Sequence, residues 1–239
     1  MSTARTTYSP GLTIRGVTPP LRLRDFGLIA FDMDSTLINI ECVDEIADAA
    51  GRKAEVAAIT EAAMRGEITD YKDSLRQRVA LLRGVPVGAL HDILERRLQL
   101  NPGAQSLVQA CKAMGLRTLL VSGGFTYFSD VVCARLGIEE SRSNVLEVVD
   151  GRLTGRMIDQ SWGDICDGEE KRRMLLYTCQ RHGIKPHQAI AVGDGANDLP
   201  MMAAAGLSVA FHAKPRVREQ ALVAIEQGGL DRLLELFEP

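Results

Sequence analysis

Two aspartates separated by one residue, Asp32 and Asp34, follow the apolar run LIAF at residues 28–31. Residues i and i+2 of an extended segment point the same way, so both carboxylates can face one small space. Bare carboxylates that close repel each other, and one would take up a proton. A divalent cation removes this conflict, and an oxygen-rich site suits Mg²⁺. The alternative is that Asp34 caps a turn while Asp32 is solvated at a strand end.

Two further apolar runs, TLLV at 118–121 and AIAV at 189–192, also end in polar residues. The candidate site residues that follow these runs are Ser122, Gly123, Asp194, Asn197 and Asp198. Parallel strands end along one edge of a sheet, so the three loops can converge there. A serine hydroxyl with free N–H groups at a helix N-terminus can bind phosphate, and acids with an amide can ligate a hard cation. Each loop alone can also be a simple turn or a capped helix start.

Lys171 belongs to the charged run EEKRR at 169–173, where a helix is predicted to begin near Glu169. A charge run of this kind is usually a solvated helix face. If Lys171 reaches the site, its ammonium can neutralise a transferring phosphoryl group as a point charge. The residues alone leave both interpretations open.

The composition excludes several classes of protein. The chain has 239 residues, a net charge of -3 and scattered basic residues, so we expect no nucleic-acid partner. We expect no membrane partner either, because no apolar run approaches the roughly 18 residues of a spanning helix. The five cysteines form no C-x-x-C pair, a pattern typical of reduced thiols in the cytoplasm. A homodimer is a further expectation about partners.

The order of the predicted elements indicates an α/β fold with an insertion. Residues 1–24 are rich in Ser, Thr, Arg, Pro and Gly and are expected to form a loose N-terminal arm. Residues 25–40 and 101–239 alternate strands with helices, which predicts a Rossmann-like parallel sheet with helices on both faces as the catalytic core. Residues 41–100 contain only amphipathic helices, which predicts an inserted small α-helical bundle as a cap.

Two local signals add boundaries to this pattern. Asn101-Pro102 predicts a helix N-cap followed by proline at the first helical position. Asp150-Gly151, between two runs of strand-forming residues, predicts a hairpin turn.

Four motifs in this order resemble the haloacid dehalogenase superfamily of phosphatases: DMDST at 32–36, SGG at 122–124, the helical lysine 171 and GDGAND at 193–198. Further stretches extend the resemblance to the phosphoserine phosphatase branch. They are Glu41, AMRG at 63–66, SLRQRV at 74–79, SGGF at 122–125, DGRLTG at 150–155 and HAKP at 212–215. Together these motifs cover most of the chain from about Phe26 onward. One departure is Tyr71, which stands where the family often has Phe.

The resemblance implies Mg²⁺-dependent hydrolysis of L-phosphoserine to L-serine and phosphate. Asp32 would be the nucleophile that forms an aspartyl-phosphate. Asp34 would protonate the leaving oxygen and then take a proton from the hydrolytic water. The Asp32 carboxylate, the Asp34 backbone carbonyl and Asp194 would hold Mg²⁺, with Asp198 assisting.

The resemblance also implies the contacts to the substrate. Ser122, the Gly123 N–H and Lys171 would bind the phosphoryl oxygens, with Arg172 as the alternative to Lys171. Asn197 would support the phosphate and its loop. The helical insertion would be a lid, in which Glu41 contacts the ammonium group and Arg78 the carboxylate of the substrate. The alternative for Glu41 and Arg78 is a solvated pair.

Two other functions remain open at this point. The same phosphoenzyme could transfer its group to another alcohol, such as homoserine, or act on another small phosphomonoester. A non-enzymatic phosphate-binding regulator would require the loss of the nucleophile or the acid, and both Asp32 and Asp34 are present.

Overall fold

The computed structural model of the chain describes residues 4–64 and 67–238 and is organised around a nine-stranded sheet. The strand order is β1-β2-β9-β8-β7-β3-β4-β5-β6. The strands are β1 (Thr6–Ser9), β2 (Leu12–Ile14), β3 (Leu28–Phe31), β4 (Arg117–Phe125), β5 (Glu140–Val149), β6 (Arg152–Ile158), β7 (Ala189–Gly193), β8 (Leu207–Phe211) and β9 (Val223–Ile225). The strands from β9 to β5 are parallel, while β1, β2 and β6 extend the two edges in antiparallel pairs.

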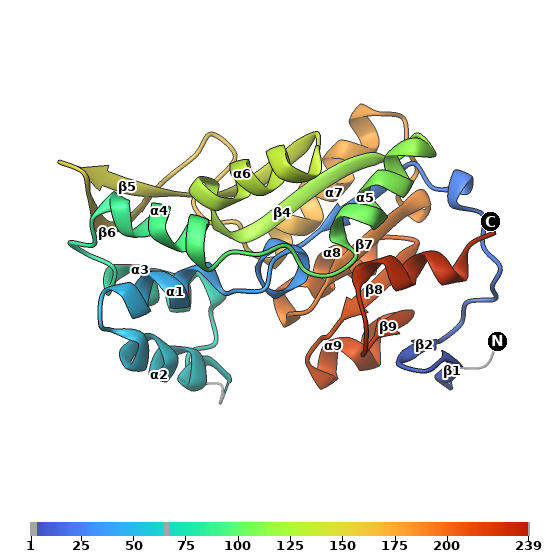
Figure 1. Cartoon of the computed structure of the whole chain (residues 1–239), viewed down its shortest axis with the longest axis horizontal. Coiled ribbons are helices and arrows are strands. Elements are labelled where there is room, and N and C mark those ends of the chain that lie inside the picture. Colours follow the sequence, from blue (N-terminus) through green and yellow to red (C-terminus); the bar gives the residue numbers. More distant parts are fainter. Residues whose placement is uncertain (1–3, 65–66, 239) are drawn as a thin grey trace.

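Helices cover both faces of this sheet (Figure 1). They are α1 (Cys42–Ala49), α2 (Lys53–Met64), α3 (Tyr71–Ala80), α4 (Val87–Arg96), α5 (Ala104–Ala113), α6 (Thr126–Leu136), α7 (Gly168–Arg181), α8 (Leu199–Ala204) and α9 (Pro215–Gln220). All four residues of β3 are buried, because Ile29 and Phe31 face one apolar core while Leu28 and Ala30 face the other. Helices α5 and α6 pack on the first core, and α7, α8 and α9 pack on the second. The predicted Rossmann-like α/β fold is confirmed. In the described part of the chain, every helix is too short or too polar to cross a lipid bilayer.

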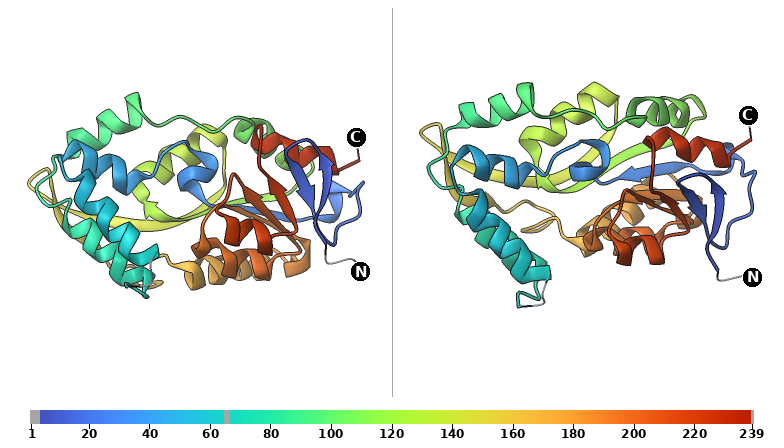
Figure 2. Two further views of the ribbon diagram at one scale, coloured as in Figure 1. Left: turned by 90° about the horizontal axis from the view of Figure 1, so that it is seen from below. Right: turned by 60° about the horizontal axis from the view of Figure 1, so that its bottom comes forward.

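Helices α1 to α4 lie at one end of the molecule, opposite β1 and β2 (Figure 2). Helix α3 packs against β6, and Gly155 permits this contact because a Cβ atom there would lie 2.9 Å from the Ala80 carbonyl oxygen. The Gly84 N–H donates to the Leu153 carbonyl at 2.8 Å and fixes the segment after α3 to the same strand. Arg65 and Gly66, which belong to one of the family motifs, lie outside the described residues.

The expectation of a loose N-terminal arm is wrong for residues 6–14. These residues form β1 and β2, and β2 pairs with β9, with Leu12 opposite Ile225. The Leu12 side chain is buried because this hairpin covers the open edge of β9. The prediction failed because it depended on composition and did not consider the unpaired edge of a strand more than 200 residues away.

Two predicted boundaries are also wrong. Helix α5 begins at Ala104 behind Gly103, so Asn101 is not its N-cap. Strand β4 continues to Phe125, with a shift of register between Val121 and Phe125, so the SGG motif lies within an irregular strand segment and not at the start of a helix. The predicted hairpin turn is confirmed, since Asp150 and Gly151 have φ values of 49° and 70° between β5 and β6.

Candidate active site

The loop after β3 carries the first two aspartates in an irregular turn. Asp32 is attached to the sheet through its N–H, which donates to the Val192 carbonyl at 2.9 Å. Residues Met33–Leu37 then form a wide turn that is not helical at Asp34 and Ser35, and Ser35 has a φ of 55°, a strained value for a residue other than glycine. A strained turn persists only when its surroundings hold it in place, so the contacts of this loop are informative.

Asn101 supplies much of this support. Its side-chain amide donates to the carbonyls of Thr36 at 2.9 Å and Ile38 at 3.0 Å, with a longer contact to Ser35 at 3.4 Å. The Asn101 backbone N–H donates to the Leu37 carbonyl at 2.8 Å. The sequence alone does not indicate this role, because Asn followed by Pro is also a helix-start signal.

Three carboxylates converge where β3 and β7 end. One ligand oxygen each of Asp32, Asp194 and Asp198 lies within 4.8 Å of the others. Lys171 on α7 is fully buried beside them, with its Nζ 2.6 Å from Asp32 Oδ1 and 2.6 Å from Asp198 Oδ1. Arg172, the alternative, lies on the exposed side of α7 and pairs with Glu169. The structure therefore places Lys171 in the site.

Two residues of this cluster have further hydrogen bonds that fix their orientation. Asp198 Oδ2 accepts from the N–H groups of Asp194 at 3.1 Å and Gly195 at 3.0 Å. Thr36 Oγ1 donates to Asp194 Oδ1 at 3.1 Å and connects the β3 loop with the β7 loop. The acidic loops are thus joined by direct contacts.

The electrostatics of the cluster favour a cation. Burial, followed by the charges of Asp198 and Glu41, raises the pKa of Asp194 to about 7. Burial and the Asp198 carboxylate also raise the pKa of Asp32 well above its usual value, although Lys171 opposes this effect. Three carboxylates and one ammonium leave two formal negative charges, which one divalent cation would balance. Because all the donors are carboxylate oxygens, the residues fit Mg²⁺.

Asp34 has a different environment. Its Oδ2 accepts from the Cys42 N–H at 3.3 Å and its Oδ1 accepts from the Cys42 thiol at 3.0 Å, so the start of α1 holds both oxygens. Burial, and after it the charge of Glu41, raises the pKa of Asp34 to about 7. A carboxyl group with this pKa can both give and take a proton near neutral pH. No motif in the sequence predicts the contact between Asp34 and Cys42.

The SGG segment of β4 lies next to the β3 loop. A Cβ atom on Gly124 would lie 3.2 Å from Asp34 Oδ2, and the Gly124 N–H donates to the buried Ser122 Oγ at 2.9 Å. The Gly123 carbonyl accepts from Asn144 Nδ2 at 2.8 Å. Asn144 in turn accepts from the Cys166 N–H at 2.8 Å. Asn144 was also missed, because it belongs to none of the recognised motifs.

Glu41 and Arg78 lie on the helical insertion, at α1 and α3. Glu41 is exposed and accepts a hydrogen bond from Ser35 Oγ at 2.6 Å. Arg78 is half-buried and makes a long contact, 3.4 Å, with the Ser74 carbonyl of its own helix. Within residues 4–64 and 67–238 neither side chain forms an ion pair, although the Asp44 carboxylate interacts with Arg78 at longer range. In the described part of the chain, these two opposite charges are thus not neutralised by an ion pair.

Asn197 lies in the short helical turn Ala196–Asp198 between β7 and α8. Its backbone carbonyl approaches the start of α7, where a Cβ atom on Gly168 would lie 2.8 Å from it. This contact joins the loop that carries Asp194 to the helix that carries Lys171.

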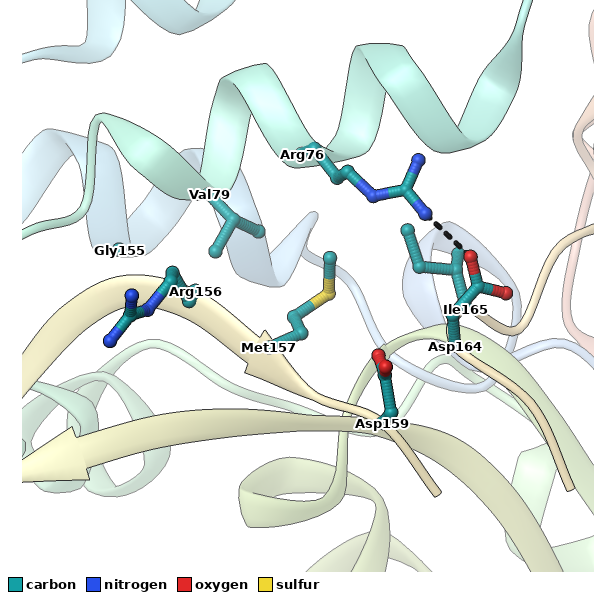
Figure 3. Close-up of a pocket in the computed structure, with 8 residues that line it drawn as sticks. All are labelled: Arg76, Val79, Gly155, Arg156, Met157, Asp159, Asp164 and Ile165. Carbon is teal, nitrogen blue, oxygen red and sulfur yellow. Dashed lines mark hydrogen bonds and ion pairs between the residues drawn. The ribbon is translucent and has the colours of Figure 1, made fainter. Parts of the chain in front are cut away.

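A separate cavity of about 230 Å³ lies between α3, β6 and residues 159–165 (Figure 3). It is lined by Arg76, Val79, Gly155, Arg156, Met157, Asp159, Asp164 and Ile165, and no predicted site residue is among them. At its edge Arg76 pairs with Asp164 at 2.5 Å, and Lys72 pairs with the same carboxylate at 2.7 Å. These pairs connect α3 to the segment before α7.

Comparisons with known proteins agree with this geometry. The family model described as haloacid dehalogenase-like hydrolase matches residues 26–206, from just before β3 to just after α8, and places the chain among hydrolases. A phosphoserine phosphatase of a Polaromonas species is 74% identical over 233 residues, which are 98% of this chain and 99% of the relative. The chain belongs to the haloacid dehalogenase-like hydrolases and, within them, to the phosphoserine phosphatase branch, as predicted.

Two solved structures are similar to this one over 89% of this chain and 99% of theirs. A phospho-aspartyl intermediate analogue of phosphoserine phosphatase is 37% identical, with a TM-score of 0.81. A substrate-bound phosphoserine phosphatase complex is 36% identical, with a TM-score of 0.80.

Proposed function

We propose that this protein hydrolyses L-phosphoserine to L-serine and phosphate through an aspartyl-phosphate on Asp32, with Mg²⁺ as its cofactor. The observation that carries the proposal is the convergence of Asp32, Asp194 and Lys171, in a chain 74% identical to a phosphoserine phosphatase. The relatives support the predicted class of enzyme, a phosphoric monoester hydrolase.

In this reaction an Asp32 carboxylate oxygen forms a bond to phosphorus while the bond from phosphorus to the serine oxygen breaks. The Lys171 ammonium, 2.6 Å from Asp32 Oδ1, favours the charged nucleophile against the effect of burial. Ser122 and the Gly123 N–H bind the phosphoryl oxygens together with Lys171, and Asn197 supports them. Such contacts stabilise the charge of the transition state.

Asp34 moves the protons of both steps. With a pKa raised to about 7 by burial, it gives its proton to the leaving serine oxygen. As a carboxylate it then takes a proton from the water that attacks the phosphorus of the aspartyl-phosphate. The Cys42 thiol and N–H keep this carboxyl group oriented during both steps.

The residues that would hold Mg²⁺ are Asp32, Asp194 and the Asp34 backbone carbonyl, with Asp198 assisting. When bound, the ion balances the charge of the carboxylates and the phosphoryl group. Asp198 contributes indirectly, because it holds Lys171 and the N–H groups of Asp194 and Gly195.

Recognition of the amino-acid part belongs to the helical insertion, residues 41–100, which we propose as a cap over the α/β core. Glu41 contacts the substrate ammonium, and Arg78 contacts its carboxylate. The absence of an ion pair for either side chain in the described part of the chain supports this assignment, since both charges are available to a zwitterion.

The cellular context and the assembly are further proposals. All five cysteines are free and four of them are buried, which fits a reducing compartment such as the cytoplasm. A homodimer stays a prediction, and light scattering on the purified protein tests it.

The experiment that tests the function is phosphate release from a set of substrates with and without Mg²⁺. The set is L-phosphoserine, phosphoethanolamine, which has no carboxylate, and 3-phosphooxypropanoate, which has no ammonium group. We expect rapid, Mg²⁺-dependent release from phosphoserine and none from Asp32→Asn. Phosphoryl transfer to added homoserine in place of release to water would contradict the proposal.

A further inference from the structure

Tyr71, the first residue of α3, places its hydroxyl against the phosphate-binding segment of β4. A Cβ atom on Gly123 would overlap the Tyr71 hydroxyl oxygen and would lie 3.2 Å from its Cζ atom. The Tyr71 ring packs against the first apolar core, which Phe31 of β3 also faces. The hydroxyl is therefore the part of the side chain that reaches the segment. The absence of a side chain at Gly123 therefore leaves room for the Tyr71 hydroxyl where the insertion contacts the α/β core.

The Tyr71 hydroxyl has no hydrogen-bond partner among residues 4–64 and 67–238. The charged groups that act on it are those of the site, Lys171, Arg78 and Asp32. Burial raises the pKa of this phenol above its usual value, so the group remains a neutral donor at physiological pH. A donor without a protein acceptor, next to a phosphate-binding segment, points to an acceptor on the ligand.

The position of Tyr71 is fixed by its neighbours on α3. Asp70 caps the helix by accepting the Lys72 N–H at 2.9 Å. The Lys72 ammonium pairs with Asp164 at 2.7 Å and lies 3.8 Å from Asp167, which caps α7. The helix that carries Tyr71 is thus attached to the helix that carries Lys171.

We propose that the Tyr71 hydroxyl donates a hydrogen bond to a phosphoryl oxygen of the bound substrate. This inference rests on the proposed function and adds a fourth phosphoryl ligand to Ser122, Gly123 and Lys171. Unlike those three, Tyr71 comes from the insertion, so the bond forms only when α3 is in contact with β4. It thereby couples closure of the insertion to binding of the reacting group.

The test is Tyr71→Phe, which keeps the ring and removes only the hydroxyl. We expect kcat/KM to fall about 10- to 100-fold, the effect of one hydrogen bond to a charged group. The loss should be equal for phosphoserine and phosphoethanolamine, since both carry the phosphoryl group. The inhibition constant for inorganic phosphate should rise by a similar factor. Tyr177→Phe is the matched control, because Tyr177 is 50% exposed on α7.

The outcomes separate this inference from the proposed function. If wild-type protein releases no phosphate from phosphoserine, the proposed function fails. If wild-type protein is active and Tyr71→Phe has unchanged kinetics and phosphate inhibition, the hydroxyl only packs against Gly123 and the inference is overturned. A loss confined to phosphoserine also overturns it, because the hydroxyl would then contact the amino-acid part. An unchanged circular dichroism melt shows that Tyr71→Phe is folded.

Discussion

At the scale of single residues, the role of Asp34 as a proton donor can be tested by comparing two leaving groups. Serine leaves as an alkoxide that needs a proton, whereas p-nitrophenolate leaves without one. We expect Asp34→Asn to lower kcat for phosphoserine about 10²- to 10⁴-fold, the usual range for a general acid. With p-nitrophenyl phosphate the same variant should release one nitrophenolate per site rapidly and then slow down, because hydrolysis of the aspartyl-phosphate lacks its base.

Stopped-flow absorbance measures this burst directly. Asp32→Asn is the control, since it lacks the nucleophile and should give no burst. A folded Asp34→Asn protein without a burst would show that Asp34 is needed for attack by Asp32, and the assignment as acid and base would be wrong.

Glu41 and Arg78 permit a second test at this scale, with two truncated substrates. Arg78→Ala should lower kcat/KM for phosphoserine roughly 10- to 100-fold, the effect of one charge-assisted contact, and should spare phosphoethanolamine. Glu41→Gln should lower kcat/KM for phosphoserine and phosphoethanolamine, which carry the ammonium group, and should spare 3-phosphooxypropanoate. Steady-state kinetics of both variants on the three substrates give the result. Equal losses on every substrate would remove the two residues from recognition of the amino-acid part.

The sequence predicted the charged residues of the site better than the residues that hold them. Asp32 and Asp194 were predictable because each lies in a recognisable motif at the end of an apolar strand, and the structure places Lys171 beside both loops. Asn144 and Cys42 were not predicted, since their partners are a backbone carbonyl and a carboxylate in other segments. A hydrogen bond to a distant backbone group leaves no local pattern in a sequence.

At the scale of secondary-structure elements, the contact between α3 and the segment before α7 depends on Asp164. This carboxylate pairs with both Lys72 and Arg76 (Figure 3 shows the pair with Arg76). We expect Asp164→Asn to raise KM for phosphoserine about 2- to 10-fold with little change in kcat, because partly exposed pairs contribute about 0–1 kcal/mol each.

Titration with salt tests the electrostatic origin of this effect. The KM values of wild type and Asp164→Asn should approach each other near about 1 M NaCl, where screening is strong. Glu139→Gln is the matched control, because Glu139 is 36% exposed and pairs with Arg117 at the start of β4, which does not line this cavity. A difference in KM that persists at high salt would exclude an ion-pair mechanism.

The elements themselves were predictable where one face or both faces are buried. Runs such as LIAF at 28–31 and AIAV at 189–192 identified β3 and β7, because parallel strands covered on both sides are apolar throughout. The hairpin of β1 and β2 was missed, because its pairing with β9 depends on an edge formed at the other end of the chain. The extension of β4 to Phe125 was missed because glycines usually signal a turn.

At the scale of the whole molecule, one apolar core includes residues of the sheet, such as Phe31, and of the insertion, such as Ile46 and Val79. We therefore expect a single unfolding transition, in which the acidic cluster titrates as part of the whole fold. Burial raises the folded-state pKa of Asp194 to about 7, above its unfolded value near 3.9. Its contribution to stability is therefore present at acid pH and is lost as the pH rises through 7.

Added Mg²⁺ should offset this loss. We expect the melting temperature of the metal-free protein to fall between about pH 5 and pH 8, and Mg²⁺ to raise it more at the higher pH. Differential scanning calorimetry measures both effects. Asp194→Asn should remove most of the dependence on Mg²⁺. An equal Mg²⁺ effect at both pH values would show that binding is not linked to the ionisation of these carboxylates.

The position of Asn101 has a consequence for the ageing of the protein. Asparagine deamidates when the backbone N–H of the next residue attacks the side-chain amide and closes a succinimide ring. The next residue here is Pro102, which has no N–H. The amide that holds the strained loop at Ser35 is therefore protected from this spontaneous damage during long storage.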